Sequence, residues 1–437
     1  MYKNVREVNI KSTNVSDVVD FKGIISAISE VKTRLKTGAF LCPRCSSVST
    51  VDQDFGEVKE PDICFNCKKT AKALDFKLVT DESEFSDYQI MYVKDLETEE
   101  SVAVKVDEEY TNSTIGDHLI GEKVRIKGVI SLYNKDKHFD LYIEANEIEK
   151  KEGESDIEDE LVEEFLEHTS FDDIRKTLIS RKKSPVADLI VLSLFSNPND
   201  PLNILISSKN NSISHVFQDL TKMVKPSIYI SGELFNNTLI AETRNETFFG
   251  EEMSFVKGGD LSLSRFGIAV ISNIDELEKT HLRTLSNSIR DGVCRIEMGL
   301  SNTRVLSGTP VLAFVNSEYE NFQKFYDNIN IPSDIKSNFD LFVKDSEYAT
   351  TEDILYLDTL NEYISAAKLI EVELPPDLED MIDDHSKELK EENISIPSNL
   401  KNTLIKLSKA RARTAYSREV REKDVEECMI LIDQIYR

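Results

Sequence analysis

The sequence predicts a chain of several domains, with a β-rich first third, a mixed α/β middle and a helical C-terminal part. Three observations support this prediction. The 437 residues are too many for one ordinary hydrophobic core. Short β-forming runs cluster before residue 150, and between residues 147 and 173 nearly every other residue is acidic, which is typical of a solvated linker or a short exposed helix. We therefore place domains at 1–150, 173–365 and 366–437, with an acidic linker at 151–172.

The composition excludes some classes of function. Lys and Arg number 53 against 80 Asp and Glu, a net charge of −27, which excludes a uniformly basic nucleic-acid coat protein. A local basic face stays open, because residues 1–80 hold 13 Lys and Arg against 10 Asp and Glu. No apolar run approaches the roughly 18 residues of a membrane-spanning helix, and the charged first residues do not form a signal peptide. We expect a cytoplasmic protein without a membrane partner.

The first domain contains five short runs of β-forming residues separated by polar turns. These runs are 18–25, 89–93, 102–106, 123–130 and 139–143. Five such strands predict a small barrel of the oligonucleotide-binding (OB) type. The strand pattern alone fits another small β-fold equally well.

Four cysteines give the strongest chemical signal. Cys42 and Cys45 form one C-x2-C pair, and Cys64 and Cys67 form a second, with the spacing of a zinc ribbon. Each pair places two thiolates on a tight turn, and the intervening hairpin brings both turns to one tetrahedral ion. Two redox pairs or two disulfides are the alternative, which the missing signal sequence disfavours. Four protein ligands leave no open coordination position, so we predict one structural Zn²⁺ per chain, in a subdomain at about 40–70.

Several segments of the first domain resemble the N-terminal part of minichromosome maintenance (MCM) proteins, which form ring-shaped replicative helicases. They are VDFKGIISAISEVKTRLKTGAFLCPRC from residue 19, the second cysteine pair introduced by Glu60-Pro61, SEFSDYQ at 83–89, and KVRIKGVI with FDLYIEANEIE at 123–149. The resemblance implies an OB-fold barrel that carries a zinc-binding subdomain. It also predicts a truncated member, because the family's helical subdomain before the barrel and winged helix after the lid have no counterpart.

A short turn between the last two predicted strands bears on DNA binding. At this position the family inserts a basic hairpin into the central channel of the ring, and the segment 133–138 here carries Lys135 and Lys137. The resemblance implies that these two lysines contact DNA phosphates, with an affinity that falls as salt rises. A solvated turn is an equal alternative.

The middle domain resembles the family's AAA+ P-loop core, but its phosphate loop differs. LNILISSKNNSISHVFQDL at 202–220 has the apolar strand and following helix of a P-loop unit. A phosphate cradle requires glycines for converging backbone N–H groups, a Lys for the β- and γ-phosphates, and a Ser or Thr for Mg²⁺. This loop contains no glycine. The resemblance places Ser214 at the lysine position and His215 at the hydroxyl position.

The next nucleotide element differs as well. The apolar strand at 267–271 ends in Ser272-Asn273, where the family has Asp-Glu to hold Mg²⁺ and polarise water. Asp275 and Glu276 follow three residues later. We do not assign them to these roles, because the shift would prolong the strand through Asn273.

Three further positions complete the comparison with the family. Asn316, in VLAFVNS, matches a polar sensor at a strand end and is retained. Asn338, in SNFD, stands in place of the arginine finger, and Ser398, in IPSNLK, stands in place of the lid's sensor arginine. Loss of an arginine finger alone typically reduces the rate about 10³- to 10⁵-fold. We therefore predict a degenerate core that does not hydrolyse ATP and is not expected to bind ATP with Mg²⁺.

The C-terminal part retains the family's scaffold. LSKARARTAYS at 407–417 and VREKDVEECMILI at 420–432 match helices of the lid, with apolar residues at helical spacing. The predicted fold is thus multidomain: an OB-fold β-barrel with a zinc-ribbon insertion, a degenerate AAA+ α/β P-loop domain, and a helical lid.

These features lead to the hypothesis of a catalytically inactive MCM paralogue, a DNA-replication protein that binds DNA or serves as a regulatory scaffold for a replicative helicase. Expected partners are single-stranded DNA, bound weakly to moderately, intact MCM or other replication proteins, and further chains in a hetero- or homo-oligomer. One alternative is an active helicase subunit completed by a neighbouring subunit, and another is a stand-alone single-stranded-DNA-binding module. In an archaeon the protein would associate with the nucleoid.

Overall fold

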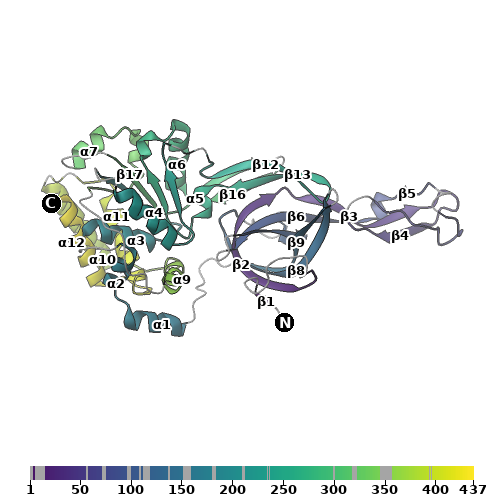
Figure 1. The fold of residues 1–437 in the computed structure, drawn as a ribbon, viewed down its shortest axis with the longest axis horizontal. Coiled ribbons are helices and arrows are strands. Elements are labelled where there is room, and N and C mark those ends of the chain that lie inside the picture. Colours follow the sequence, from purple (N-terminus) through teal and green to yellow (C-terminus); the bar gives the residue numbers. More distant parts are fainter. Residues whose placement is uncertain are drawn as a thin grey trace. The chain divides into compact units, whose positions relative to one another are not determined.

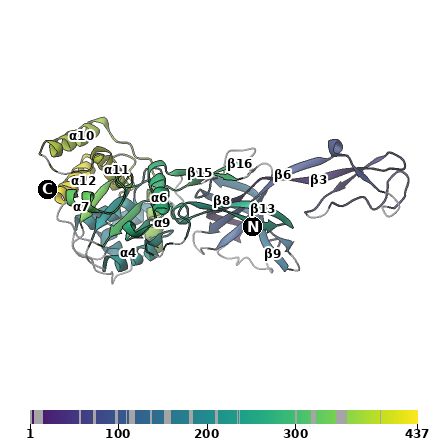
Figure 2. The ribbon, with the colours of Figure 1, turned by 90° about the horizontal axis from the view of Figure 1, so that it is seen from above.

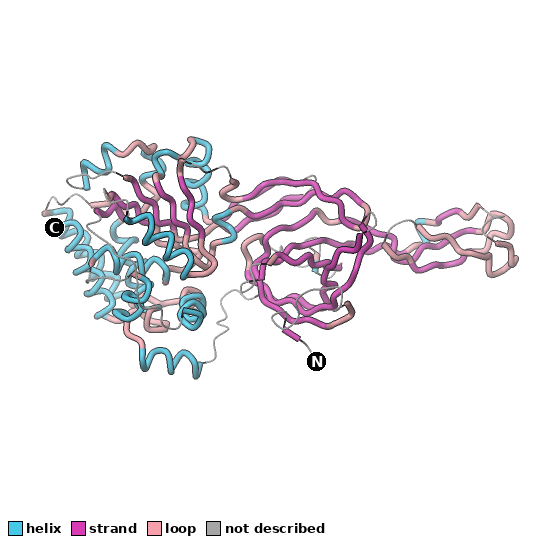
Figure 3. The backbone as a smooth tube through the Cα atoms, viewed as in Figure 1, coloured by secondary structure: helices cyan, strands magenta, loops and turns pink. Residues whose placement is uncertain are grey.

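The computed structural model describes most of the chain and divides it into two compact units. The described residues are 3–4, 15–55, 58–70, 75–95, 100–107, 110–111, 119–135, 138–150, 159–179, 184–208, 212–233, 235, 237–298, 301–316, 322–344, 357–392, 394 and 396–437. The first unit contains Met1–Lys150, Thr243–Lys257 and Ile296–Arg304, and the second contains Lys151–Glu242, Gly258–Arg295 and Val305–Arg437. Strands dominate the first unit, whereas the second combines strands with most of the helices (Figure 3).

A closed five-stranded barrel forms the centre of the first unit (Figure 1). Its strands in spatial order are β2 (Val18–Ser29), β8 (Lys123–Lys135), β9 (His138–Lys150), β7 (Ser101–Asp107) and β6 (Glu84–Asp95). Strand β2 pairs with β6, which closes the sheet into a barrel. Strands β7 and β9 pair in parallel. Each of the five predicted runs lies inside one of these strands. The predicted barrel is therefore confirmed.

Alternate residues of the barrel strands fill its interior. Ile24, Met91, Val104 and Ile143 are among the fully buried side chains, as the period of two in a strand requires. Gly23 lies where two strands approach closely, because a Cβ at this position would lie 2.5 Å from the carbonyl oxygen of Lys94.

A three-stranded ribbon extends from the barrel (Figure 2). It consists of β3 (Lys32–Leu41), β4 (Val48–Asp52) and β5 (Lys77–Leu78), and β3 pairs with β6 of the barrel. Phe40 and Phe76 pack beside Cys42 and Cys64 in a small core at the end of the ribbon. The two-residue strand β1 (Lys3–Asn4) pairs with β2.

Two hairpins from later in the chain contribute to the first unit. One is formed by β12 (Ala241–Phe248) and β13 (Glu251–Gly258), and β13 adds an antiparallel strand to β2. Its two-residue loop, Phe249 and Gly250, has φ angles of 52° and 81°, as a tight hairpin turn requires. The other is formed by β15 (Val293–Met298) and β16 (Ser301–Leu306).

A parallel five-stranded sheet forms the centre of the second unit. Its order is β11 (Ile228–Ser231), β14 (Ala269–Ser272), β17 (Val311–Val315), β10 (Ile204–Ser207) and β18 (Leu341–Lys344). Every residue of β10, β14 and β17 is buried. Such continuous apolar runs are typical of parallel strands that are covered on both faces.

Helices before and between these strands complete the α/β part of the second unit. They are α1 (Asp159–His168), α2 (Phe171–Leu178), α3 (Pro185–Leu194), α4 (Ser212–Met223), α5 (Asp260–Leu263), α6 (Lys279–Asp291), α7 (Phe322–Asn328) and α8 (Ser333–Lys336). Within the predicted linker, residues 159–168 are therefore helical. Ser170 caps α2, because its hydroxyl accepts a hydrogen bond from the backbone N–H of Asp173.

Four helices of the described residues follow β18, and three of them lie within the predicted helical part, 366–437. They are α9 (Leu357–Ala367), α10 (Pro376–Glu391), α11 (Leu400–Arg413) and α12 (Glu422–Tyr436). Val425, Leu431 and Ile432 of α12 are buried, as their helical spacing predicted. In the part of the chain that the structure describes, no helix has both the length and the apolar character needed to cross a membrane.

Candidate metal centre and candidate nucleotide site

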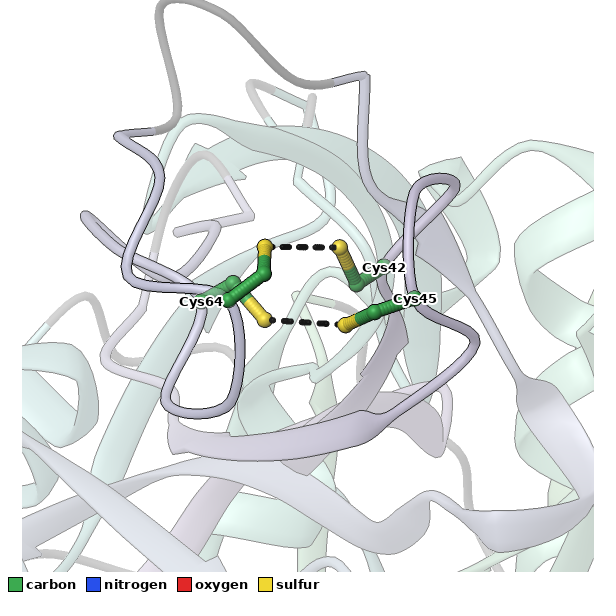
Figure 4. A group of neighbouring side chains, drawn as sticks. Cys42, Cys45 and Cys64 are labelled. Atoms are coloured by element: carbon green, nitrogen blue, oxygen red, sulfur yellow. Dashed lines mark hydrogen bonds between the residues drawn. The ribbon is translucent and has the colours of Figure 1, made fainter.

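The four predicted cysteine ligands converge at the end of the ribbon (Figure 4). All four Sγ atoms lie within 4.8 Å of one another. The Sγ atoms of Cys42 and Cys67 are 3.8 Å apart, and those of Cys45 and Cys64 are 3.6 Å apart. A tetrahedral Zn²⁺ with bonds of about 2.3 Å separates its sulfur ligands by about 3.8 Å. The geometry of the four thiols therefore fits zinc.

Both halves of the cluster have the same backbone conformation. In the first pair, the N–H of Ser46 donates to the carbonyl oxygen of Cys42 at 2.9 Å, and in the second the N–H of Lys68 donates to that of Cys64 at 2.9 Å. Ser46 and Lys68 have φ angles of 53° and 55°. Each tight turn directs two sulfur atoms to the same side, so the C-x2-C spacing is sufficient to build half of the site.

A serine that the sequence analysis did not single out assists the cysteines. The hydroxyl of Ser47 lies 3.0 Å from the Sγ of Cys45 and 3.3 Å from the Sγ of Cys64. Hydrogen bonding from Ser47 is the main cause that lowers the pKa of the Cys64 thiol to about 6, and it also lowers the pKa of Cys45. Because the thiolate is the form that binds metal, this hydroxyl favours metal binding.

The predicted nucleotide positions at the strand ends reach one edge of the parallel sheet. Ser272 of β14 is level with Phe314 of β17, which is level with Ile206 of β10. Asn273 and Asn316 follow the ends of their strands at this same edge. In open parallel sheets, ligands bind beyond the carboxyl ends of the strands. The register therefore supports a common site for these positions.

Helix α4 follows β10 from the same edge of the sheet. Ser214 and His215 lie in its first turn, where Ser214 is half-buried and His215 is exposed. The loop that joins β10 to α4, residues 209–211, lies outside the described residues.

The two residues at the end of β14 are engaged by the neighbouring part of their own chain. Ser272 is buried, and its hydroxyl donates to the carbonyl oxygen of Ile230 at 3.3 Å. Asn273 adopts a left-handed conformation with a φ of 47°, and its side-chain amide donates to a carboxylate oxygen of Glu233 at 2.8 Å. Both polar side chains thereby hydrogen-bond to residues of β11 or of the turn that follows it.

Two carboxyl groups follow in a separate turn of 3₁₀ helix, Ile274–Glu276. Strand β14 ends at Ser272, before both of these residues. Burial raises the pKa of Asp275. Desolvation and the nearby carboxylate of Glu233 raise the pKa of Glu276. Both shifts are toward the neutral acid.

Three domain models of one family match the chain in sequence order. They are the MCM OB domain over residues 4–134, the MCM P-loop domain over 144–355 and the MCM AAA-lid domain over 358–436. The chain belongs to the MCM family. The predicted order of an OB barrel, a P-loop domain and a lid is thereby confirmed.

Individual MCM relatives are distant in sequence. The minichromosome maintenance protein of Saccharolobus solfataricus is 22% identical over 95% of this chain and 69% of its own length. DNA replication licensing factor MCM4 of Oryza sativa is 24% identical over 97% of this chain and 59% of its own length. An uncharacterized MCM-type protein of Methanocaldococcus jannaschii is 21% identical over 76% of this chain and 51% of its own length. The chain is thus similar to between half and about two thirds of each of these proteins.

Three MCM positions assigned from the resemblance lie at different places in the second unit. Asn316 is exposed at the end of β17. Asn338, at the arginine-finger position, donates from its side-chain amide to the hydroxyl of Ser286 at 2.8 Å and to the Ser286 carbonyl oxygen at 3.2 Å. Ser286 belongs to α6 of the same chain. Ser398 is exposed in the turn before α11.

The structure gives partial information on the two lysines assigned to DNA. Lys135 ends β8 and pairs with His138 across the β8–β9 hairpin, but its side chain, like Lys137 as a whole, lies outside the described residues. Further along β8, Arg125 binds Asp20 through two hydrogen bonds of 2.8 Å. These two charges neutralise each other, so this part of the barrel surface is less basic than its lysine and arginine content predicts.

Proposed function

We propose that this MCM-family chain does not hydrolyse ATP and acts in DNA replication as a DNA-binding, regulatory or scaffold component that associates with a replicative helicase. The proposal depends chiefly on the end of β14. The family resemblance assigns an Asp-Glu pair to Ser272 and Asn273, and these side chains instead hydrogen-bond to Ile230 and Glu233 of their own chain. Mg²⁺ in such sites requires carboxylate or hydroxyl oxygen ligands together with phosphate.

The position of Asn338 supports the same proposal. An arginine finger acts by extending a positive charge to the phosphates, either in its own site or in that of a partner. Asn338 has no charge, and its amide is engaged by Ser286 of the same chain. This arrangement also argues against a subunit that completes the active site of its neighbour.

The OB domain and the four cysteines support a role that does not require ATP. Barrels of this type bind oligonucleotides, and a closed four-thiolate zinc site stabilises structure rather than catalysing a reaction. We infer that the barrel unit binds single-stranded DNA, and that the P-loop and lid domains provide the surfaces for other MCM or replication proteins. The protein would then act at the site of DNA replication rather than throughout the cytoplasm.

ATP hydrolysis with and without single-stranded DNA tests the proposal. We expect no turnover above that of a heat-denatured sample, and no change in Ser214→Ala or Asp275→Ala. Turnover that disappears in either variant would contradict the proposal. The assay is repeated with an intact MCM helicase added, because turnover above that of the intact helicase alone and dependent on Asp275 would identify a subunit completed by its neighbour.

The proposed partners are tested by affinity purification from the native cell. Recovery of an intact MCM or another replication protein would support the scaffold role. Recovery of the chain alone, bound to single-stranded DNA, would support a stand-alone DNA-binding module instead.

A further inference from the structure

The β12–β13 hairpin covers an outer face of the barrel that is rich in aromatic residues. Along β6, Met91 and Val93 point into the barrel and are buried, but Tyr88 and Ile90 on the opposite face are buried as well. They share one hydrophobic cluster with the hairpin residues Phe248, Phe249, Met253 and Phe255. The hairpin therefore shields this part of the outer face from solvent.

Two phenylalanines at the tip of the hairpin stack on rings of the barrel unit. The ring centroid of Phe248 lies 4.3 Å from that of Tyr133, with the planes 29° apart. The ring of Phe249 lies 4.0 Å from that of Phe55, with the planes 20° apart. Phe249 also makes an edge contact with Tyr142 at 5.3 Å. These separations are those of favourable aromatic pairs.

Carboxylates of the hairpin accept hydrogen bonds from tyrosines of the same face. The hydroxyl of Tyr92 donates to a carboxylate oxygen of Glu246 at 3.1 Å. Desolvation is the main cause that raises the pKa of Tyr88. The charge of Glu251 and the hydrogen bond between the two side chains raise it further. The hairpin thus offers both flat rings and negative charges to this face.

The covered face is the one that OB folds use to bind oligonucleotides. In such barrels the second and third strands form the binding face, and here these strands in chain order are β6 and β7. Their outer side carries Tyr88, Tyr92 and the buried Lys105, whose ammonium pairs with Glu144 at 2.6 Å. Arg34 lies next to this side with its guanidinium 4.5 Å from the Phe55 ring centroid. Aromatic rings that stack bases and cations that contact phosphates are the usual components of a single-strand site.

We propose that the β12–β13 hairpin is a displaceable cover that competes with single-stranded nucleic acid for the outer face of β6 and β7. Its phenylalanine rings occupy the positions of stacked bases, and its carboxylates occupy those of phosphates. The antiparallel pairing of β13 with β2, with Phe255 opposite Ser29, fixes the position of the hairpin on the barrel. This inference rests on the proposed DNA binding by the barrel.

Removal of the two rings tests the inference in the full-length protein. The affinity for a fluorescent 20-nucleotide oligo(dT) is measured by anisotropy for the wild type and for Phe248→Ser with Phe249→Ser. The apparent dissociation constant equals the intrinsic one divided by the open fraction, so we expect the variant to bind at least about tenfold more tightly. Thr247→Ala, at an exposed position of the same hairpin, is the matched control and should bind like the wild type.

A covalent lock provides the complementary test if the double serine variant does not fold. Lys257 of β13 lies directly opposite Ala27 of β2, and directly opposed positions in antiparallel strands are within reach of a disulfide. In Ala27→Cys with Lys257→Cys, we expect the oxidised protein to lose oligo(dT) binding by at least about tenfold relative to the reduced protein.

The two tests separate this inference from the proposed function. If the serine variant binds no more tightly than the wild type, or the oxidised lock binds as tightly as the reduced one, the hairpin is not a competitor, although the barrel still binds DNA. If the folded serine variant and the reduced cysteine variant both fail to bind oligo(dT), the barrel does not bind single-stranded DNA. The proposed competition is then wrong as well.

Discussion

The two candidate sites of this chain differ in what their polar side chains contact. At the end of the ribbon, all four cysteines converge within 4.8 Å, and the two turns that carry them have matching backbone geometry. At the edge of the parallel sheet, Ser272 and Asn273 are instead hydrogen-bonded to neighbouring residues of the chain. A structural metal site is linked to folding, because its binding free energy is folding free energy. A catalytic site lacks this link.

The parallel sheet is held together by residues other than those at its nucleotide edge. Its order and register depend on strands β10, β14 and β17, whose residues are all buried. The hydroxyl of Ser272 donates to the Ile230 carbonyl oxygen, so this buried hydroxyl is not left without a hydrogen bond. The fold therefore does not depend on the side chains predicted at the nucleotide edge, whereas the core that the described residues of the ribbon form includes its cysteines.

The largest effect is expected from loss of one cysteine ligand. Cys64→Ser removes a thiolate from the cluster, and structural zinc sites of this kind contribute on the order of 10 kcal/mol. We expect the zinc content, measured by elemental analysis, to fall from about one ion per chain to near zero, with loss of amide protection in the ribbon. Cys294→Ser, at a half-buried cysteine outside the cluster, should retain its zinc. Retention of zinc by Cys64→Ser would show that the four thiols do not act together.

A smaller effect is expected from breaking an ion pair at the base of the parallel sheet. Lys406 of α11 binds the carboxylate of Asp340 at 3.0 Å, and Asp340 also accepts a hydrogen bond from the N–H of Asn203 at 2.8 Å. Lys406→Met leaves Asp340 buried without its cation, which typically costs about 3 kcal/mol. Urea unfolding of the second unit measures the change, with exposed Lys423→Met as the control. A loss no larger than that of the control would contradict the role of this pair in the fold.

The pH dependence of stability tests the role of Lys368, a buried residue of the second unit. It is fully buried, and its ammonium donates to the carbonyl oxygens of Phe266 and Gly267. Burial lowers the pKa of Lys368 to about 7 from 10.5. Between pH 7 and 10.5 the unfolded state therefore binds more protons than the folded state, and the free energy of unfolding rises with pH.

We expect the contribution of Lys368 to the free energy of unfolding to rise by about 2 kcal/mol between pH 7 and pH 9. Urea unfolding at pH 7, 8 and 9 measures it as the difference between the wild type and Lys368→Met, whose stability should lack this contribution. An equal pH dependence in both proteins would mean that Lys368 keeps its ordinary pKa.

The smallest effect is expected at the arginine-finger position. Asn338→Ala removes a partly exposed amide and its hydrogen bonds to Ser286, which should cost about 1 kcal/mol of stability. The effect on stability should thus be less than half that of Lys406→Met, and ATP turnover should stay absent. A loss of catalytic turnover on this substitution would place Asn338 in an active site.

Local sequence patterns predicted the barrel and the metal site but not the hairpin that covers the barrel. The five barrel strands alternate between interior and exterior residues, and the C-x2-C spacing alone defines each half of the cysteine cluster. The hairpin at Ala241–Gly258 has polar residues along β12, which is typical of a solvated strand. Its pairing partner, β2, lies more than 200 residues earlier, so no local pattern reveals it. The consecutive Phe248 and Phe249 before Gly250 were the available signal.

The contacts of the residues at the candidate nucleotide site were not predicted, for a related reason. Residue identities and the family resemblance assigned Ser272, Asn273 and Asn338 to the nucleotide site, and these assignments stay predictions. Their hydrogen bonds to Ile230, Glu233 and Ser286 join residues 40 to 52 positions apart, and no local sequence pattern reveals the strand register and helix packing that bring them together. Two of the positions assigned to phosphate contacts, Lys135 and Lys137, remain predictions.

The most direct test of the account is a titration of the wild-type chain with a fluorescent ATP analogue, with Mg²⁺ and with EDTA. The account predicts no saturable binding in the micromolar range under either condition, because β14 ends in Ser272 and Asn273, whose side chains bring no carboxylate to hold Mg²⁺. Micromolar binding that requires Mg²⁺ and weakens in Asp275→Ala would contradict it.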